Sequence, residues 1–191
     1  MIDYAVIGHI DTRGKSRDGG EVAEAFLTAI GNRRLIVITS EHQNEGKSTT
    51  SRLLAERISE KGKPVLLIEG DMYHRVMSMA HSRIVYHKGP RKPYIETARH
   101  YKGYEIVSFN DRVKEPQEII SSEEFATLMR DAKDRYEVVI IDTPPVGHYT
   151  DAVEISKLAD GVVFVHAQSR PEITTEMENV LGVITTSAVW R

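Results

Sequence analysis

Short apolar runs rich in β-branched residues recur along the chain and predict the strands of a buried sheet. They cover residues 35–38, 65–68, 138–141 and 162–165. None of these runs alternates between apolar and polar positions, as a strand with one face in water would. Both faces of the sheet are therefore expected to be covered, which is typical of parallel strands.

Helical patterns lie between these runs. The clearest covers residues 48–61, where Leu54 and Ile58 share one face, and Gly62 with Pro64 supplies the stop signal. Weaker helical patterns cover residues 22–30, 122–132 and 151–158. Alternating strands and helices predict an α/β fold with a doubly wound, mainly parallel sheet flanked by helices. In such folds the ligand site lies beyond the carboxyl ends of the strands.

The composition limits both the size of the domain and its partners. With 191 residues, of which 40% are hydrophobic, the chain can bury one substantial core. We expect a polar N-terminal arm over residues 1–20, followed by one domain over residues 21–191. A formal net charge of −3 argues against a general nucleic-acid binder, which needs a surplus of lysine and arginine.

Cysteine and long apolar segments are both missing from the sequence. The absence of cysteine excludes disulfides, thiolate metal sites and cysteine nucleophiles, and it fits a reducing cytosol. No apolar run approaches the roughly 20 residues that a membrane-spanning helix needs. We therefore expect a cytoplasmic protein with no direct membrane span, whose contact with a membrane comes through a partner.

Residues 73–103 form a basic, histidine-rich segment, in which arginine and lysine recur against the single acid Glu96. Three interpretations stay open: a solvated insertion that balances acidic segments elsewhere, a docking surface for an acidic or phosphorylated partner, and a histidine metal site.

A phosphate-binding loop is predicted directly after the first of the apolar strands. A loop between a strand and a helix presents backbone N–H groups to phosphate, and the helix dipole adds attraction. Lys47 is expected to reach the β and γ oxygens, Ser48 to ligate magnesium, and Thr49 to bind the α-phosphate. The first glycine of the P-loop consensus is replaced by Glu41. The expected nucleotide-binding residues are Asn44, Glu45, Gly46, Lys47, Ser48 and Thr49.

Carboxylates end two further strands of the predicted sheet. Asp142 follows an apolar strand, as in the Walker B arrangement, while Glu69 and Asp71 follow residues 65–68. Because the carboxyl ends of parallel strands meet at one edge, these three acids are expected to share a metal with Ser48. Asp71 is the candidate general base for an incoming hydroxyl or water during phosphoryl transfer.

In the order and spacing of these motifs, the chain resembles the bacterial tyrosine kinases that regulate capsule and exopolysaccharide assembly, which are relatives of the MinD and ParA ATPases. The resemblance covers about residues 21–183, and beyond the motifs above it includes residues 115–125, 136–145 and 158–161. It implies a P-loop NTPase fold that binds ATP or ADP with Mg²⁺ and transfers the γ-phosphate to a protein tyrosine. Lys47, Asp71 and Asp142 are the catalytic residues that it implies. The implied partner is a membrane-embedded polysaccharide co-polymerase, which would hold the domain at the inner face of the membrane.

The chain departs from this family at several motif positions. Asn44 replaces a loop glycine, Glu69 replaces an aspartate, and Tyr73 replaces an arginine. Thr186 occupies a position where an asparagine often contacts the adenine, and no tyrosine follows Tyr149, although family kinases usually phosphorylate a carboxyl-terminal tyrosine cluster. A MinD- or ParA-like ATPase switch and a nucleotide-binding pseudo-kinase without phosphotransfer therefore stay open as alternatives.

The first predicted helix also departs from the family. Leu27 and Ile30 occupy positions where the family has arginines for ring assembly. We therefore expect a monomer or a weak oligomer.

Overall fold

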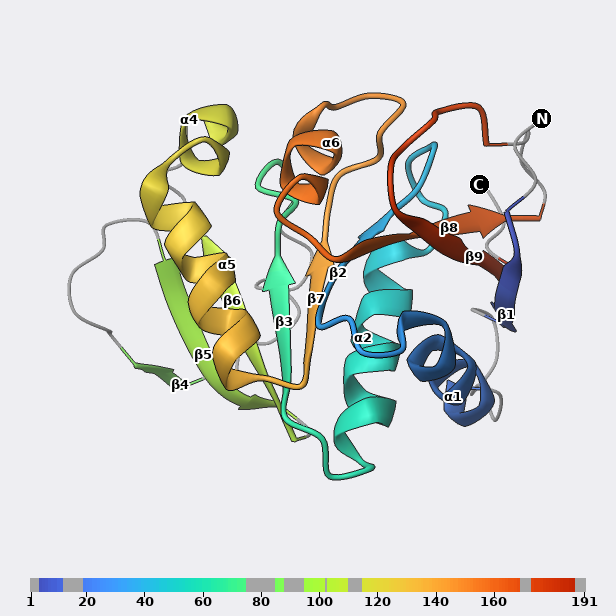
Figure 1. Cartoon of the computed structure of the whole chain (residues 1–191), viewed down its shortest axis with the longest axis horizontal. Helices are drawn as coiled ribbons and strands as arrows, with labels where there is room; N and C mark the ends of the chain where they lie inside the picture. The colour runs from blue at the N-terminus through green and yellow to red at the C-terminus, as the bar shows by residue number, and fades with distance from the viewer. Residues whose placement is uncertain are drawn as a thin grey trace.

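A single sheet organises the part of the chain that the computed structural model describes, which comprises residues 4–11, 19–74, 85–87, 95–101, 103–109, 115–168 and 173–187. Its strands are β1 (Val6–Ile10), β2 (Leu35–Thr39), β3 (Val65–Glu69), β4 (Val85–His87), β5 (Ile95–Tyr101), β6 (Tyr104–Phe109), β7 (Val138–Asp142), β8 (Gly161–Ala167) and β9 (Val180–Thr186). They are arranged in the order β1-β9-β8-β2-β7-β3-β6-β5-β4 (Figure 1).

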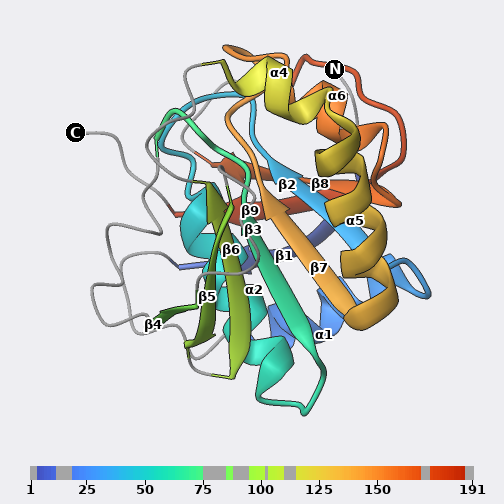
Figure 2. The same ribbon diagram turned by 90° about the vertical axis from the view of Figure 1, so that its left-hand side faces the viewer.

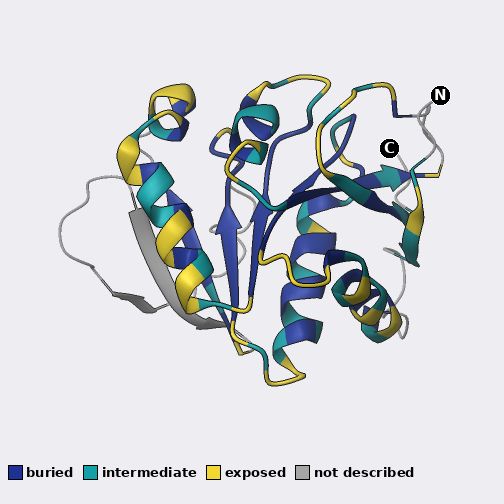
Figure 3. Cartoon of the chain, in the orientation of Figure 1, coloured by how far each residue is buried: buried dark blue, intermediate teal, exposed yellow. Residues whose placement is uncertain are grey.

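The sheet is mainly parallel, as the sequence predicts. The strands from β1 to β6 in this order pair in parallel, and only β5 and β4 continue the edge beyond β6 in antiparallel pairing. All residues of β2, β3 and β7 are buried (Figure 3). Strands covered on both faces have no polar alternation, which is why these elements appear in the sequence as continuous apolar runs.

Helices cover both faces of the sheet: α1 (Gly19–Ile30), α2 (Lys47–Ser59), α4 (Pro116–Ile120), α5 (Glu123–Arg135) and α6 (Asp151–Ser156). α1 and α2 pack with residues such as Ile36 and Ile38 in one apolar cluster. α4, α5 and α6 pack with Leu35 and Val37 in a second cluster on the opposite face (Figures 1 and 2). Successive residues of a strand point to opposite faces, so each buried strand contributes to both clusters. This layered arrangement confirms the predicted α/β class.

Strand β1 lies within the residues expected to form a polar arm. Val6–Ile10 pairs in parallel with β9, and Ile10 is buried. The sequence does not predict this strand, because Gly8 and His9 interrupt its apolar pattern and Val6 remains 66% exposed at the edge. Within the arm, residues 1–3 and 12–18 lie outside the described residues.

The basic segment of residues 73–103 is described only in part. Tyr73 and His74 follow β3, and the backbone of β4 and β5 is placed within the segment. The remaining residues, except Gly103, lie outside the described part of the chain. The three interpretations of this segment therefore stay predictions.

Asp160 links the start of β2 to helix α5. One carboxylate oxygen accepts hydrogen bonds from the backbone N–H groups of Arg34 and Leu35, each at 3.0 Å. The other oxygen pairs with the ammonium group of Lys133. Burial by itself would raise the pKa of Asp160, but Lys133 and the two N–H donors outweigh it and lower this pKa. The ionised carboxylate therefore stabilises the edge of the sheet opposite the candidate site.

Replacing Asp160 by asparagine should lower the free energy of unfolding by about 1 kcal/mol at neutral pH, because the charge-assisted bond to Lys133 is lost. Since the pKa of Asp160 is lowered on folding, the ionised form stabilises the fold above its ordinary pKa of about 4, and this contribution is lost as the pH falls. Urea denaturation should therefore give a penalty that shrinks toward about pH 3. The control is Glu123→Gln, because the Glu123–Arg130 pair has side chains that are 79% and 62% exposed. A penalty independent of pH would contradict this account of Asp160.

Candidate functional site

The candidate site begins with the loop between β2 and α2, at the carboxyl edge of the sheet. Two residues of this loop have left-handed backbone conformations, Asn44 with φ 61° and Gly46 with φ 93°. Glycine adopts this conformation without strain, and asparagine tolerates it better than most residues. The geometry therefore explains how asparagine can occupy a loop position that is glycine in the resembling family.

Lys47 and Ser48 form the first turn of α2. Lys47 is 8% exposed, and no side chain caps the amino terminus of the helix. The first N–H groups of a helix have no partners within the helix, and the helix dipole makes this end attractive to anions. A buried lysine beside such N–H groups provides the environment that phosphate oxygens require.

Asp142, the last residue of β7, contacts the first turns of α2. It accepts hydrogen bonds from the hydroxyl groups of Ser48 at 2.6 Å and Ser51 at 3.1 Å. Burial raises the pKa of Asp142 to about 6, although Lys47 and the two hydroxyl groups oppose this shift, and Asp71 adds to it. Ser51 was not identified from the sequence, but its spacing of three residues from Ser48 places both on one helix face.

Glu69 and Asp71 lie at the end of the neighbouring strand β3. Glu69 is buried and is paired in register with Asp142. The Asp71 carboxylate accepts the backbone N–H groups of Tyr73 at 3.1 Å and His74 at 2.9 Å. The backbone just after β3 lies close to the end of β7: the Gly70 N–H donates to the Asp142 carbonyl at 2.7 Å, and a Cβ atom at Gly70 would lie 2.9 Å from the same oxygen.

The acids at this edge do not form a protein-only metal cluster. Within the described ranges, no three acidic or histidine side chains lie together in an arrangement that could hold a metal ion. What the fold does bring together is the hydroxyl of Ser48 and the carboxylate of Asp142, next to Lys47. Magnesium is usually bound by one or two oxygen ligands together with phosphate oxygens and water, so this donor set fits a magnesium–nucleotide complex.

Tyr73, whose backbone N–H donates to Asp71, forms an aromatic stack with Tyr149. The rings of Tyr73 and Tyr149 stack with centroids 4.4 Å apart, and Tyr73 is 42% exposed. The ring of His74 meets Tyr149 edge-on at 6.4 Å. Sequence reasoning missed this stack because the two tyrosines are far apart in the chain.

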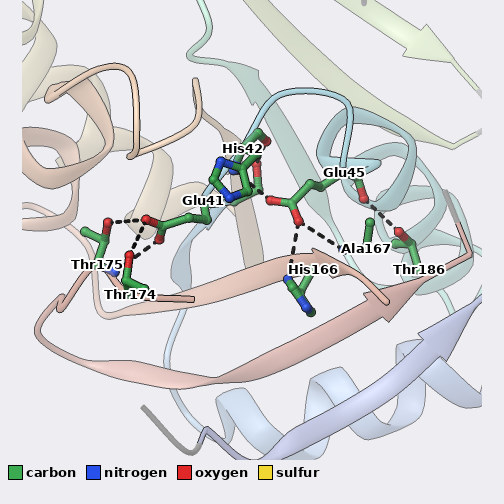
Figure 4. Close-up of polar contacts among 9 residues, drawn as sticks. Glu41, His42, Glu45, His166, Ala167, Thr174, Thr175 and Thr186 are labelled. Carbon is green, nitrogen blue, oxygen red and sulfur yellow. Dashed lines mark hydrogen bonds and ion pairs between the residues drawn. The ribbon is translucent and has the colours of Figure 1, made fainter. Parts of the chain in front are cut away.

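The loop between β2 and α2, which is the predicted phosphate loop, is held in place by contacts with several other parts of the chain. The backbone N–H of Gly147 donates to the Glu41 carbonyl at 3.1 Å. The Glu41 carboxylate accepts hydrogen bonds from Thr174 and Thr175 (Figure 4). Thr186, expected at an adenine-contact position, is buried and donates its hydroxyl to the Glu45 carbonyl at 2.8 Å. Asn44 in the loop and Thr49 in the first turn of α2 are both exposed.

Comparison with known proteins relates this site to two groups of P-loop proteins. The family model of the ATPase MipZ matches residues 34–169. The putative tyrosine-protein kinase CapB of Staphylococcus aureus is 26% identical over 84% of this chain and 73% of its own length. The tyrosine-protein kinase YwqD of Bacillus subtilis is 30% identical over 72% of this chain and 61% of its own length.

A solved structure supports the same relationship at the level of the fold. The crystal structure of the chimerical protein CapA2B2 has a TM-score of 0.78, with 24% identity over 96% of this chain and 94% of that chain. The predicted resemblance to bacterial tyrosine kinases, within a superfamily of P-loop ATPases, is confirmed by these matches. Among the described helices, none has the length and apolar character required to cross a bilayer.

Replacing Gly147 by alanine should destabilise the site, because the added methyl group would lie 2.4 Å from the Glu41 carbonyl oxygen. Overpacking of this kind costs roughly 1–3 kcal/mol, which thermal and urea unfolding can measure. Gly20→Ala is the matched control, since nothing lies within 4 Å of a Cβ atom there and the position is helical. The control should be neutral or slightly stabilising. Equal effects of the two substitutions would contradict the contact between the two loops.

Proposed function

Because the chain belongs to the MipZ family of ATPases, we propose that it binds ATP with Mg²⁺ and transfers the γ-phosphate to a protein tyrosine. The observation that carries this proposal is the contact between Ser48 and Asp142 directly beside Lys47. It joins the phosphate loop to the acid at the end of β7, as nucleotide hydrolysis and phosphoryl transfer both require. The kinase relatives favour tyrosine as the acceptor.

Lys47 and the N–H groups at the start of α2 would bind the β- and γ-phosphates. Ser48 and Asp142 would hold Mg²⁺, which neutralises charge on the phosphates when it is bound. Glu69 would support this site through water, because it is buried one strand away in register with Asp142. Burial raises the pKa of Asp142, so its ionised carboxylate would gain most from a nearby cation.

The strand order supports one orientation of the bound nucleotide. Asp142 on β7 and Asp71 after β3 lie on one side of β2, and strands β8 and β9 lie on the other. The γ-phosphate would therefore face Asp71, and the nucleoside would lie toward the other side. Asp71 would accept the proton of the tyrosine hydroxyl or orient a water. An acceptor tyrosine that reaches Asp71 would approach past the exposed ring of Tyr73.

We also propose a role in capsule or exopolysaccharide synthesis or export. In this role, the domain would act at the cytoplasmic face of the membrane through a polysaccharide co-polymerase. The similarity to the kinase CapB and to the chimerical protein CapA2B2 supports this context.

We propose that the domain is a monomer or a weak oligomer. Ile30 is 2% exposed and Leu27 packs against the same core, so both positions stabilise the interior.

An ATPase switch is the second candidate function, and the match to the MipZ model over residues 34–169 favours it. A nucleotide-binding pseudo-kinase is the third. Incubation with labelled ATP and magnesium separates the three candidates. Label on tyrosine supports the kinase, release of free phosphate supports the switch, and bound but unreacted ATP supports the pseudo-kinase.

Replacing Lys47 by alanine should weaken ATP binding by about tenfold to a hundredfold, because a charge-assisted interaction with phosphate is lost from a buried site. Isothermal titration calorimetry with magnesium present measures this change. Lys63→Ala is the control, since Lys63 pairs with Glu137 and its side chain is 39% exposed. An affinity of Lys47→Ala equal to that of the control would refute the phosphate site.

Replacing Asp71 by asparagine should abolish phosphoryl transfer while ATP affinity stays within about threefold. A general base contributes roughly a hundredfold to ten-thousandfold to the rate. The amide oxygen of the variant can still accept the N–H groups of Tyr73 and His74, so the local turn should persist. Transfer and binding must be measured on the same preparation. Transfer at the parent rate would exclude Asp71 as the base.

A further inference from the structure

The side chain of Glu45 points into the protein from within the phosphate loop. It is fully buried, and each of its carboxylate oxygens accepts a backbone N–H group (Figure 4). Oε2 accepts the N–H of His42 at 2.8 Å, and Oε1 accepts the N–H of Ala167 at 3.1 Å. The ring Nδ1 atom of His166 lies 3.3 Å from Oε1.

These contacts join three separate parts of the site. His42 belongs to the loop itself, Ala167 ends β8, and the Glu45 carbonyl accepts the hydroxyl of Thr186 at the end of β9. Glu45 directly precedes Gly46 and Lys47. The carboxylate and the backbone carbonyl of Glu45 therefore hold the loop in place immediately before the residues proposed to bind phosphate.

We propose that Glu45 is a positioning residue that sets the conformation of the phosphate loop before nucleotide binds. This inference rests on the proposed nucleotide binding. A loop that already has its binding conformation does not have to be ordered by the ligand. If only a fraction of the molecules has this conformation, the apparent affinity for the ligand falls by that fraction. The Glu45 side chain would thus raise phosphate affinity without touching phosphate.

The chemistry of the partners makes the carboxylate necessary. Both donors to Glu45 are backbone N–H groups, which cannot reverse their polarity. A glutamine has one accepting oxygen and one donating NH₂ group, so one of the two N–H groups would face another donor. A buried donor without an acceptor is unfavourable, and the loop would shift to relieve it.

Glu41 provides a matched control in the same loop. Its Oε1 atom accepts the hydroxyls of Thr174 and Thr175, both at 2.9 Å, and its Oε2 atom accepts the N–H of Thr175 at 3.1 Å. Hydroxyl groups rotate and can accept as well as donate. A glutamine at this position can therefore place its oxygen on the N–H and its NH₂ group on the hydroxyls.

The test compares Glu45→Gln with Glu41→Gln by calorimetry. The probes are ATP with magnesium and inorganic tripolyphosphate with magnesium. Glu45→Gln should weaken both probes by about tenfold or more, and by the same factor, because the loop contacts phosphate groups that both probes share. Glu41→Gln should change neither affinity by more than about threefold.

Thermal unfolding without ligand distinguishes positioning from a purely structural role. Titrations are run at a temperature where every variant is folded, so a variant that is merely less stable retains its affinity. If Glu45→Gln does not fold, Thr186→Val serves instead, since it removes the donor to the Glu45 carbonyl and should weaken tripolyphosphate binding by about tenfold.

The outcomes separate this inference from the proposed function. Parent protein that binds neither probe contradicts the proposed function and the inference together. If the parent protein binds both probes and Glu45→Gln binds them with the affinity of the parent or of Glu41→Gln, the inference is overturned and the proposed function stands. Where Thr186→Val is used instead, an unchanged affinity for tripolyphosphate overturns the inference about Glu45.

Discussion

The parallel pairing of β2 with β7 is the constraint on which the candidate site depends. Ile38 on β2 lies in register with Asp142 on β7, so the loop that follows β2 begins beside that acid. Asp71, two residues after the end of β3, lies at the same edge of the sheet. The carboxyl ends of parallel strands lie at one edge of the sheet. The register of these strands is therefore enough to bring a short loop and two acids far apart in the sequence to the same place.

Burial at this edge creates an electrostatic requirement. Asp142 is buried, and burial raises its pKa to about 6 even with Lys47 and two serine hydroxyls nearby. Glu45 is also buried, but it is surrounded by backbone donors. The two acids thus differ in role. The hydrogen-bond donors to Glu45 come from the protein backbone, whereas Asp142 lies where Mg²⁺ and phosphate are proposed to bind. Burial of an ionised carboxylate is tolerated only when hydrogen-bond donors or a cation stabilise its charge.

Local sequence patterns predicted the central strands, the loop between β2 and α2 and the position of Asp142 at the end of a strand, because each depends on a continuous run or a fixed spacing. Strand β1 was not predicted, because Gly8 and His9 interrupt its apolar run and the strand is stabilised by pairing with β9, which is distant in the sequence. The expected cluster of three acids around a metal was also not found in the described residues. Register places Glu69 beside Asp142, but register alone does not determine how far a side chain reaches.

The side-chain partners of the loop were beyond sequence reasoning for a different reason. Glu41 was recognised only as a departure from a glycine consensus, whereas in the fold it binds Thr174 and Thr175, more than 130 residues away. Its sequence neighbours carry no signal of these contacts. These hydrogen bonds form only because the fold brings the segment between β8 and β9 next to the loop after β2.

The contacts of Glu41 have a consequence for the motions of the native chain. Its carbonyl accepts the amide of Gly147, and its carboxylate accepts the amide of Thr175. Local opening of the phosphate loop would release both amides at once, so residues from three distant segments form a single cooperative unit of hydrogen exchange. A bound ligand that keeps the loop closed would slow exchange in all three segments by a common factor.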